Sequence, residues 1–432
     1  MSWKIKEYSS GRLFEGDKGI WMIYFLLCII SLVEIYSASS NLTFKTGNHW
    51  DPVVDQAIFL FLGFLLIQAL VRIPCKFFKL IPVLGIPIVV GLLGYLLFSP
   101  KNINSASRWF PILGHQFQPS EIAKSMLILQ VAVILSKANL KRRKLGNQSS
   151  EIRREIMSHA FTKICIYMVL ICGLIVPENF STAFMLGVVV FVMMFVGNIP
   201  KVRLGQLMLV LVCCAALGAV ALILIPDNKL GEGRALTWKN RITSHIGYSG
   251  NNSKKQDKKS TYDINEKWQE NTSQIAIANS NVIGLGVGNS IERDFLPHAE
   301  SDFIYSIIIE ETGLFGGLLV MMLYVTLLVR VWKVAQRCDK FFPAYLVIGL
   351  GLMMVVQALV NMSVAVGLIP VTGQTLPLIS HGGTSILITS FNMGLILSVS
   401  RYVEHLEKVP NRLEEFENNS EDHALSTNVA SK

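Results

Sequence analysis

The chain contains few charged residues for its length. Only 16% of its 432 residues are Asp, Glu, Lys or Arg, whereas 51% are hydrophobic. Soluble globular domains carry about 25% charged residues. The composition therefore excludes an ordinary soluble protein and indicates that much of the chain lies in a membrane.

Cysteine is also sparse, and its placement excludes two further classes. None of the seven cysteines falls in the long polar segment 227–301, and no Cys-x-x-Cys spacing occurs. Neither a disulfide framework nor a cysteine metal site is implied. The first apolar stretch is too long for a cleavable signal peptide, and no small-residue cleavage site precedes a soluble domain.

Long hydrophobic runs dominate the rest of the chain. A helix needs about 20 apolar residues to cross a bilayer. We predict an all-α polytopic membrane protein with a cytoplasmic segment 1–17, one helical bundle over 18–401 and a disordered cytoplasmic tail over 402–432. The ten predicted spans are 18–38, 55–72, 78–98, 119–137, 162–177, 181–198, 205–226, 302–330, 344–367 and 384–401.

Lys and Arg in the short loops predict the orientation, because they concentrate on the cytoplasmic side. With the N-terminus inside, the short outward loops contain only Lys45, Lys101 and Arg108. Both termini are then cytoplasmic. The net charge of +9 is explained by orientation in the membrane, so no nucleic-acid partner is needed.

The polar segment of about 227–301 is predicted to form one long extracytoplasmic loop between the seventh and eighth helices. Long loops cross the membrane regardless of their charge. Its lysines lie among Asn, Ser and Gln. They indicate a solvated flexible stretch or, as the less favoured interpretation, attraction to an anionic lipid or polymer; they are Lys254, Lys255, Lys258 and Lys259.

Polar residues interrupt the apolar pattern over 104–124. Ser120 is suited to cap a helix whose first turn contains Glu121. Lys124 lies three residues further on and therefore shares a face with Glu121. Either the pair is a structural salt bridge, or Lys124 is a cation held in a cavity to bind a phosphate. Arg108 is either an interfacial anchor or a second phosphate contact.

Prolines and glycines forbid continuous helix over 368–385, although the residues between them are apolar. Non-helical backbone at membrane depth occurs only when it is buried in protein or lines a watery cavity. We predict a re-entrant segment lining a cavity. The polar residues of 176–183, between the fifth and sixth helices, are explained by a tight outer turn. Gln357 and Asn361 share a helix face, and a helix–helix hydrogen bond accounts for them.

One carboxylate, Asp302, stands where the long polar loop meets an apolar helix. A charge at a membrane boundary costs free energy, so a charged residue there indicates a functional site. The alternative is a carboxylate in the first turn of a helix that begins near Ser301, where the helix dipole favours it. Glu310 and Glu311 follow two to three turns later and are candidates to line the same cavity. The glycine-rich stretch 284–288 lacks the context of a nucleotide loop.

An outward cavity has no supply of nucleotide-activated donors, so a transferase there would use a lipid-linked phosphate. Such a substrate needs cations for the pyrophosphate, a groove for the lipid and a base for the acceptor hydroxyl. Arg108 and Lys124 are candidates for the cations, the broken helices for the groove, and Asp302 for the base.

Three motifs occur in order and carry a resemblance to a known family. They are Arg108-Trp109 with Gln118-Pro-Ser-Glu-Ile-Ala-Lys124, Leu296-Pro with Ser301-Asp302-Phe-Ile and Glu310-Glu-Thr-Gly313, and Pro370-Val-Thr-Gly-Gln-Thr-Leu-Pro377 with Ser380-His-Gly-Gly-Thr-Ser385. Over nearly its whole length the chain resembles the SEDS family of bacterial shape, elongation, division and sporulation proteins, the FtsW/RodA group.

The resemblance implies a peptidoglycan glycosyltransferase in the bacterial cytoplasmic membrane. Such enzymes polymerise lipid II, an undecaprenyl-pyrophosphate disaccharide-peptide, together with a class B penicillin-binding protein. The donor's α-linked sugar is inverted to a β-1,4 bond, with Asp302 as the catalytic match. A divalent cation, Mg²⁺ or Mn²⁺, could assist the leaving pyrophosphate, but no ligand cluster specifies one. The implied substrate-binding residues are Arg108, Glu121, Lys124, Thr372 and Ser380, and the cavity supports are Glu311 and Gln118.

The chain departs from the family pattern at several positions. His298 and Glu300 stand where the family usually has Glu and His, and His381 replaces a usual Tyr. The segment 177–182 lacks the usual Asp. The opening 15–19 and the basic inner loops favour the division branch, which implies septal localisation and further division proteins as partners.

Three alternatives remain open from the sequence. A transporter that flips lipid II would use the same polar cavity and broken helices. A polymerase of the elongation branch, RodA-type, would share the motifs. A scaffold that only recruits its penicillin-binding partner would not need to bury Lys124.

Overall fold

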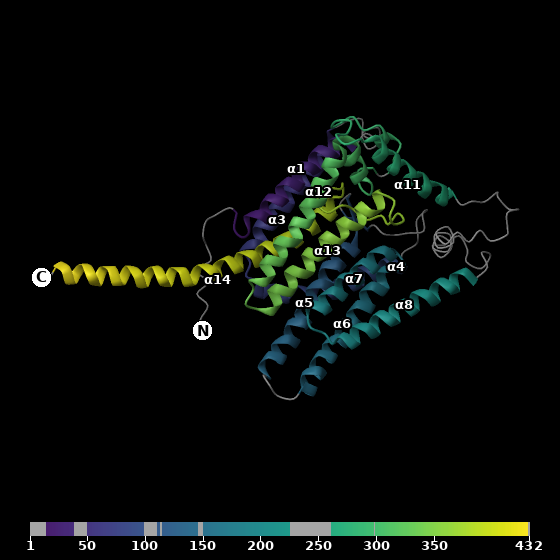
Figure 1. Cartoon of the computed structure of the whole chain (residues 1–432). Coiled ribbons are helices and arrows are strands. Elements are labelled where there is room, and N and C mark those ends of the chain that lie inside the picture. The colour runs from purple at the N-terminus through teal and green to yellow at the C-terminus, as the bar shows by residue number, and fades with distance from the viewer. Residues whose placement is uncertain are drawn as a thin grey trace.

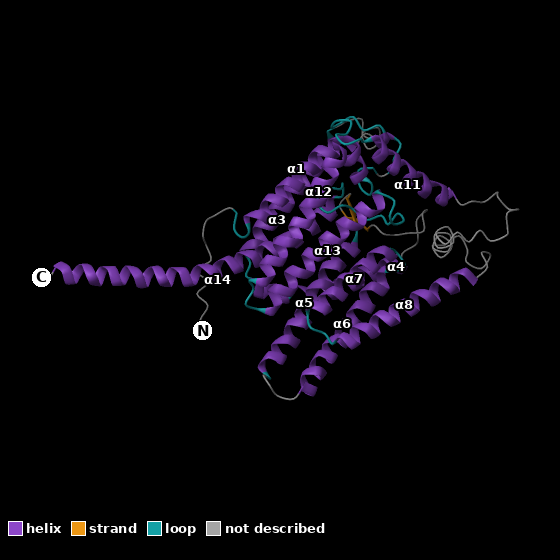
Figure 2. Ribbon diagram, viewed as in Figure 1, coloured by secondary structure: helices purple, strands orange, loops and turns teal. Residues whose placement is uncertain are grey.

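The computed structural model describes residues 14–38, 50–98, 110–112, 115–145, 150–224, 261–297 and 299–430. Helices form nearly all of this part of the chain (Figure 2). The elements are α1 (Lys18–Ala38), α3 (Asp51–Arg72), η2 (Cys75–Lys79), α4 (Ile81–Phe98), β1 (Phe110–Ile112), β2 (His115–Phe117), α5 (Pro119–Lys144), α6 (Ser150–Ile175), α7 (Phe180–Val196), α8 (Lys201–Leu224), α11 (Thr261–Asn279), η4 (Glu292–Asp294), α12 (Ile304–Gln336), α13 (Phe341–Ala365) and α14 (Gly383–Ala430).

The predicted all-α membrane fold is confirmed, and a helix lies at each of the ten predicted spans. Seven helical segments of the described chain are long and apolar enough to cross a membrane. The helix α7 is apolar but has only 17 residues, and α5 and α8 are outside the seven. The number of ten crossings therefore stays a prediction.

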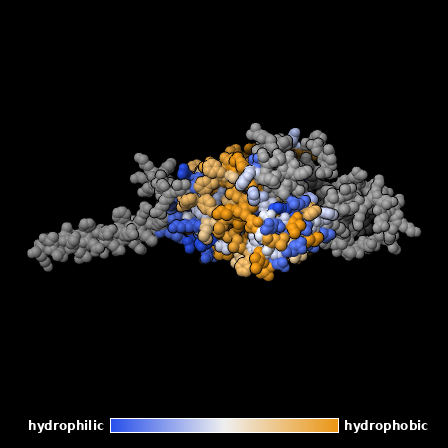
Figure 3. Space-filling model, turned by 90° about the horizontal axis from the view of Figure 1, so that it is seen from above, coloured by the Kyte–Doolittle hydropathy of each residue, from blue (hydrophilic) through white to orange (hydrophobic). Residues whose placement is uncertain are grey.

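The bundle is centred on α5 and α13. Both helices bury side chains around their whole circumference, as expected for helices enclosed by others. The helices α4, α6 and α7 pack against α5, α12 packs against α13 and α1, and α14 packs against α3 (Figure 1). Hydrophobic side chains form a broad part of the described surface (Figure 3), as a lipid-facing surface requires.

A small hairpin precedes α5. The strands β1 and β2 pair antiparallel, with Phe110 opposite Phe117. This addition was not predicted because each strand has only three residues, too few for a periodic pattern.

The predicted long loop contains a helix. The helix α11 packs against α12 and α13. Its Ser273 hydroxyl donates to the Ala365 carbonyl at 2.8 Å. Thr272, Ser273 and Ala276 of this helix are buried. Lys254, Lys255, Lys258 and Lys259 lie outside the described residues.

The helix α12 begins later than predicted and is interrupted. It starts at Ile304, so Asp302 precedes the helix instead of occupying its first turn. Inside it, Gly313 has φ 72°. A Cβ there would lie 2.2 Å from the Val282 carbonyl oxygen, so only glycine fits against the preceding loop.

The helix α14 extends into the segment 402–432, for which disorder stays a prediction. The helix α14 continues from the bundle through Ala430 (Figure 1). Its segment 411–417, Asn-Arg-Leu-Glu-Glu-Phe-Glu, is rich in residues of high helix propensity.

Candidate active site

The candidate site contains a buried ion pair near the start of α5. The Lys124 ammonium lies 2.7 Å from a Glu121 carboxylate oxygen, and both side chains are buried. Pro119 begins the helix, and the Gln118 carbonyl accepts from the Glu121 amide at 3.1 Å. A buried pair is sustained only when its remaining polar atoms find partners. The predicted shared face is confirmed.

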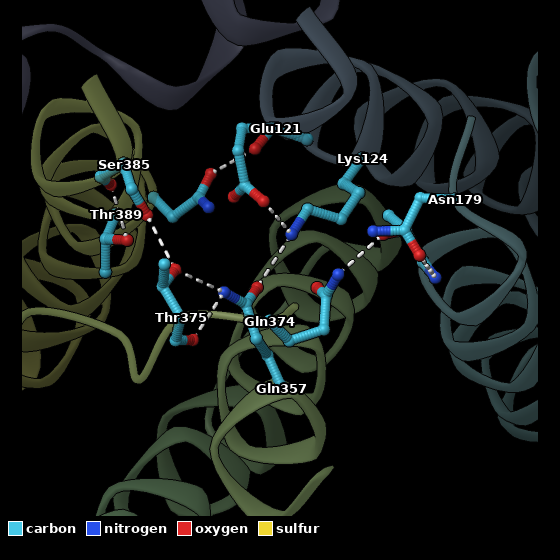
Figure 4. Close-up of polar contacts among 11 residues, drawn as sticks. Glu121, Lys124, Asn179, Gln357, Gln374, Thr375, Ser385 and Thr389 are labelled. Atoms are coloured by element: carbon cyan, nitrogen blue, oxygen red, sulfur yellow. Dashed lines mark hydrogen bonds and ion pairs between the residues drawn. The ribbon is translucent and has the colours of Figure 1, made fainter. Parts of the chain in front are cut away.

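Lys124 connects this pair to α13. Its ammonium also donates to Gln357 Oε1 at 2.7 Å, which is the helix–helix hydrogen bond predicted for Gln357 (Figure 4). The Gln357 amide in turn donates to the Thr375 carbonyl at 3.0 Å. The network therefore runs from α5 through α13 into the segment between α13 and α14.

Asn361, one turn along α13, joins that segment to Asp302. Its side-chain amide donates to the Gln374 carbonyl at 2.7 Å and to the Asp302 carbonyl at 2.8 Å. The sequence assigned Asn361 only a contact between helices. Its true partners are non-helical carbonyls, which no periodic pattern identifies. Asn361 is thus a site residue that sequence reasoning missed.

The segment 366–382 is non-helical, which confirms the predicted break over 368–382, whereas residues 383–385 already belong to α14. Most residues of this segment are buried or half-buried. Gly367 and Gly373 have positive φ angles, as does Leu378. Gln374 donates to the Thr182 hydroxyl at 2.7 Å. Asn179 caps α7 through the Thr182 amide, so the turn predicted over 176–183 is present (Figure 4).

Ser380 and His381 hold the residues immediately before Asp302. The Ser380 hydroxyl donates to the Ser301 carbonyl at 2.5 Å and accepts from the Leu376 amide at 2.7 Å. The His381 amide donates to the Glu300 carbonyl at 2.8 Å. Together with the Asn361 bond, three successive carbonyls, at 300, 301 and 302, are fixed. The half-buried Asp302 therefore has a defined backbone position.

The structure brings together most, but not all, of the predicted site residues. Lys124 and Glu121 are linked through Gln357 to the backbone of segment 374–376, and Asp302 and Ser380 are linked to the same segment. The Gln118 carbonyl accepts from the Glu121 amide at the edge of this region. The Thr372 hydroxyl is buried and has no hydrogen-bond partner among the described residues. Arg108 and His298 lie outside the described residues.

Glu311 occupies a different environment from the rest of the predicted set. Its carboxylate accepts from the Gly288 amide at 3.0 Å, the Ser290 amide at 3.3 Å and the Ser37 hydroxyl. Glu310 accepts from the Ser290 hydroxyl at 2.5 Å. These carboxylates hold the glycine-rich loop onto α12.

The outer loop contains a carboxyl group with a shifted pKa. Burial and, secondarily, the Glu310 carboxylate raise the pKa of Glu292 in the outer loop. Within the described ranges, no group of three His, Cys, Asp or Glu side chains is arranged to hold a metal ion. A divalent cation at the pyrophosphate stays a prediction.

The fold and the site define a polytopic membrane protein with a non-helical segment clamped beside a carboxylate. Residues 17–405 match the sequence profile of the FtsW/RodA/SpoVE family, described as cell cycle protein. The chain belongs to this family.

Individual relatives extend over almost the whole chain. It is 28% identical over 401 residues to the probable peptidoglycan glycosyltransferase FtsW of Bacillus subtilis, covering 90% of this chain and 88% of that protein. It is 30% identical to the protein of the same name from Enterococcus hirae, covering 93% and 97%.

Solved structures support the same fold. A chain from a structure of a peptidoglycan synthase complex, described as coordinating polymerization and crosslinking, aligns with TM-score 0.65 and 23% identity, covering 90% of this chain and 98% of that one. The rod shape determining protein RodA of Thermus thermophilus aligns with TM-score 0.59 and 23% identity, covering 89% and 97%.

Proposed function

We propose that this protein is a peptidoglycan glycosyltransferase that polymerises lipid II, with Asp302 as the general base. One observation carries the assignment: Asn361, Ser380 and His381 fix the backbone at Asp302 beside the network that contains Lys124. A base must be held within reach of the proton that it removes. The names of the relatives, which cover the same length of chain, support the choice of reaction.

The reaction needs a base for the proton of the acceptor and cations for the leaving pyrophosphate. The Asp302 carboxylate removes the proton of the acceptor sugar hydroxyl. The oxygen attacks the anomeric carbon of the donor, the carbon–oxygen bond to the pyrophosphate breaks, and the configuration inverts. The negative charge that develops on the pyrophosphate requires cations.

Lys124 is suited to receive that charge. An ammonium has three donor hydrogens. Glu121 and Gln357 take two of them in the described part of the chain, which leaves one for a phosphate oxygen. Arg108 is proposed as the second cation, and Thr372 as a hydroxyl that contacts substrate.

The experiment must separate polymerisation from transport. Purified protein is given lipid II in detergent micelles, where no membrane separates two sides, and glycan strands are resolved by gel electrophoresis. We expect strands whose formation is insensitive to moenomycin. A flippase has nothing to transport under these conditions, so the absence of product with and without the partner would exclude the polymerase.

The cellular role follows from the division-type features of the chain. We propose septal synthesis in the cytoplasmic membrane, with both termini inside and a class B penicillin-binding protein as partner. The related structure described as coordinating polymerization and crosslinking supports a cross-linking partner. Localisation of a fluorescent fusion tests the role, because an elongation enzyme would be distributed along the side wall.

A further inference from the structure

An exposed apolar turn lies on the surface next to the kink of α12. Ile283 exposes 85% of its surface, the highest value among the large hydrophobic residues of the described chain, and Val282 exposes 62%. Polar Asn281 precedes them, and Gly284 follows with φ 81°. A soluble loop gains nothing from presenting two branched aliphatic side chains to water.

The backbone of this turn contacts the backbone of α12 directly. A Cβ on Gly284 would lie 2.3 Å from the Glu311 carbonyl oxygen, as closely as one on Gly313 would approach Val282. The amides of Leu285 and Gly286 donate to the Glu310 and Glu311 carbonyls, each at 2.9 Å. The position of the turn along α12 is therefore fixed at Gly313.

The part of α12 after Gly313 is by itself long enough to cross a membrane. The residues after it make up about 23 positions, which at 1.5 Å per residue reach about 34 Å, slightly more than a hydrocarbon core. Directly after the glycine, Leu314 exposes 54% and Phe315 exposes 77% of its surface. These side chains belong to a helix apolar enough to span a membrane, and their exposed face is suited to lipid. The backbone of the apolar turn lies against Gly313, immediately before these two residues.

We propose that the turn 281–284 inserts into the lipid leaflet on the Asp302 side of the membrane, with Val282 and Ile283 as the anchor. The anchor fixes the depth of the loop that leads to Asp302. The backbone contact of the turn with Gly313, directly before the exposed Leu314 and Phe315, favours lipid as the occupant over a partner protein. The proposal stands independently of the reaction proposed above.

Spin labels test the insertion in the full chain. The seven native cysteines are replaced by alanine, and single cysteines are placed by Ile283→Cys, Phe315→Cys and Asn289→Cys in liposomes. Asn289 is the matched control, because it is an exposed polar residue of the same loop. The accessibility of each label to oxygen, which concentrates in lipid, is compared with its accessibility to a water-soluble nickel chelate.

We expect the oxygen-to-nickel ratio at 283 to equal that at 315 and to exceed that at 289 several-fold. A ratio at 283 equal to that at 289 would place the turn in water and overturn the proposal. Low accessibility of 283 to both reagents would mean that protein covers the turn, and this would overturn it equally. The label at 315 verifies in the same series that the chain is inserted.

Discussion

At the scale of residues, the candidate active site buries polar groups at positions where apolar side chains would cost less free energy. Lys124 and Glu121 illustrate this, since only 2% and 6% of their surfaces are exposed. Removing one partner of a buried pair leaves an uncompensated charge, whereas removing both is often tolerated. Stability and activity can therefore be separated by substitution.

The variant Lys124→Met is expected to destabilise the protein by about 3–5 kcal/mol, because the Glu121 charge remains buried without its partner. The double variant Glu121→Gln/Lys124→Met is expected to regain most of that stability yet stay inactive, since the cation is still missing. Thermal unfolding in detergent and strand synthesis measure the two effects. An active double variant would remove Lys124 from the proposed site.

Asn361 is expected to affect activity more than stability. The variant Asn361→Leu loses the bonds to the Asp302 and Gln374 carbonyls, each worth about 0.5–1.5 kcal/mol. Loss of the bond to Asp302 displaces the base, and a small misplacement can cost about 100-fold in rate.

Asn139→Leu is the matched control for this variant. Asn139 is equally buried and donates to two carbonyls, those of Leu135 and Gly197, at the C-terminal end of α5. We expect a similar loss of thermal stability with unchanged specific activity. Equal losses of activity in the two variants would show that Asn361 is only structural.

At the scale of elements, helices could be predicted from the sequence but their connections could not. The predicted span 18–38 coincides with α1 because a run of apolar residues has no alternative in a membrane. The start of α12 was misplaced by two residues, and α11 was missed because its apolar positions are few. The non-helical backbone of 366–382 was predictable from its prolines and glycines. Its partners, such as Asn361, depend on tertiary packing.

The close backbone contact between Gly313 of α12 and the 282–284 turn, called the interlock below, belongs to this scale. Gly313→Ala is expected to destabilise the protein by at least about 2 kcal/mol, since a positive φ alone costs about 1–2 kcal/mol and a backbone clash adds to it. The matched control is Gly187→Ala in α7, where nothing lies within 4 Å of the added Cβ. Thermal unfolding compares the two. Equal midpoints would contradict the interlock between α12 and the 282–284 turn.

At the scale of the whole molecule, we propose that Asp302 lies on the outer side of the membrane. Charge distribution in the short loops supports this orientation. A cysteine at Asn289 should react with an impermeant maleimide in intact cells, whereas one at Lys201, the exposed first residue of α8, should react only after permeabilisation. The opposite labelling pattern would place the candidate site in the cytosol, where the proposed substrate supply does not apply.

The most direct measurement compares strand synthesis by Asp302→Asn and Asp294→Asn. Asp294 is an exposed carboxylate in the same loop, so the control removes an equal charge nearby. General-base catalysis contributes about 10²–10⁴-fold. We predict a loss of at least about 100-fold for Asp302→Asn, with unchanged thermal unfolding, and full activity for Asp294→Asn. Polymerisation by Asp302→Asn at the rate of the unmodified protein would contradict the assignment of Asp302 as the base.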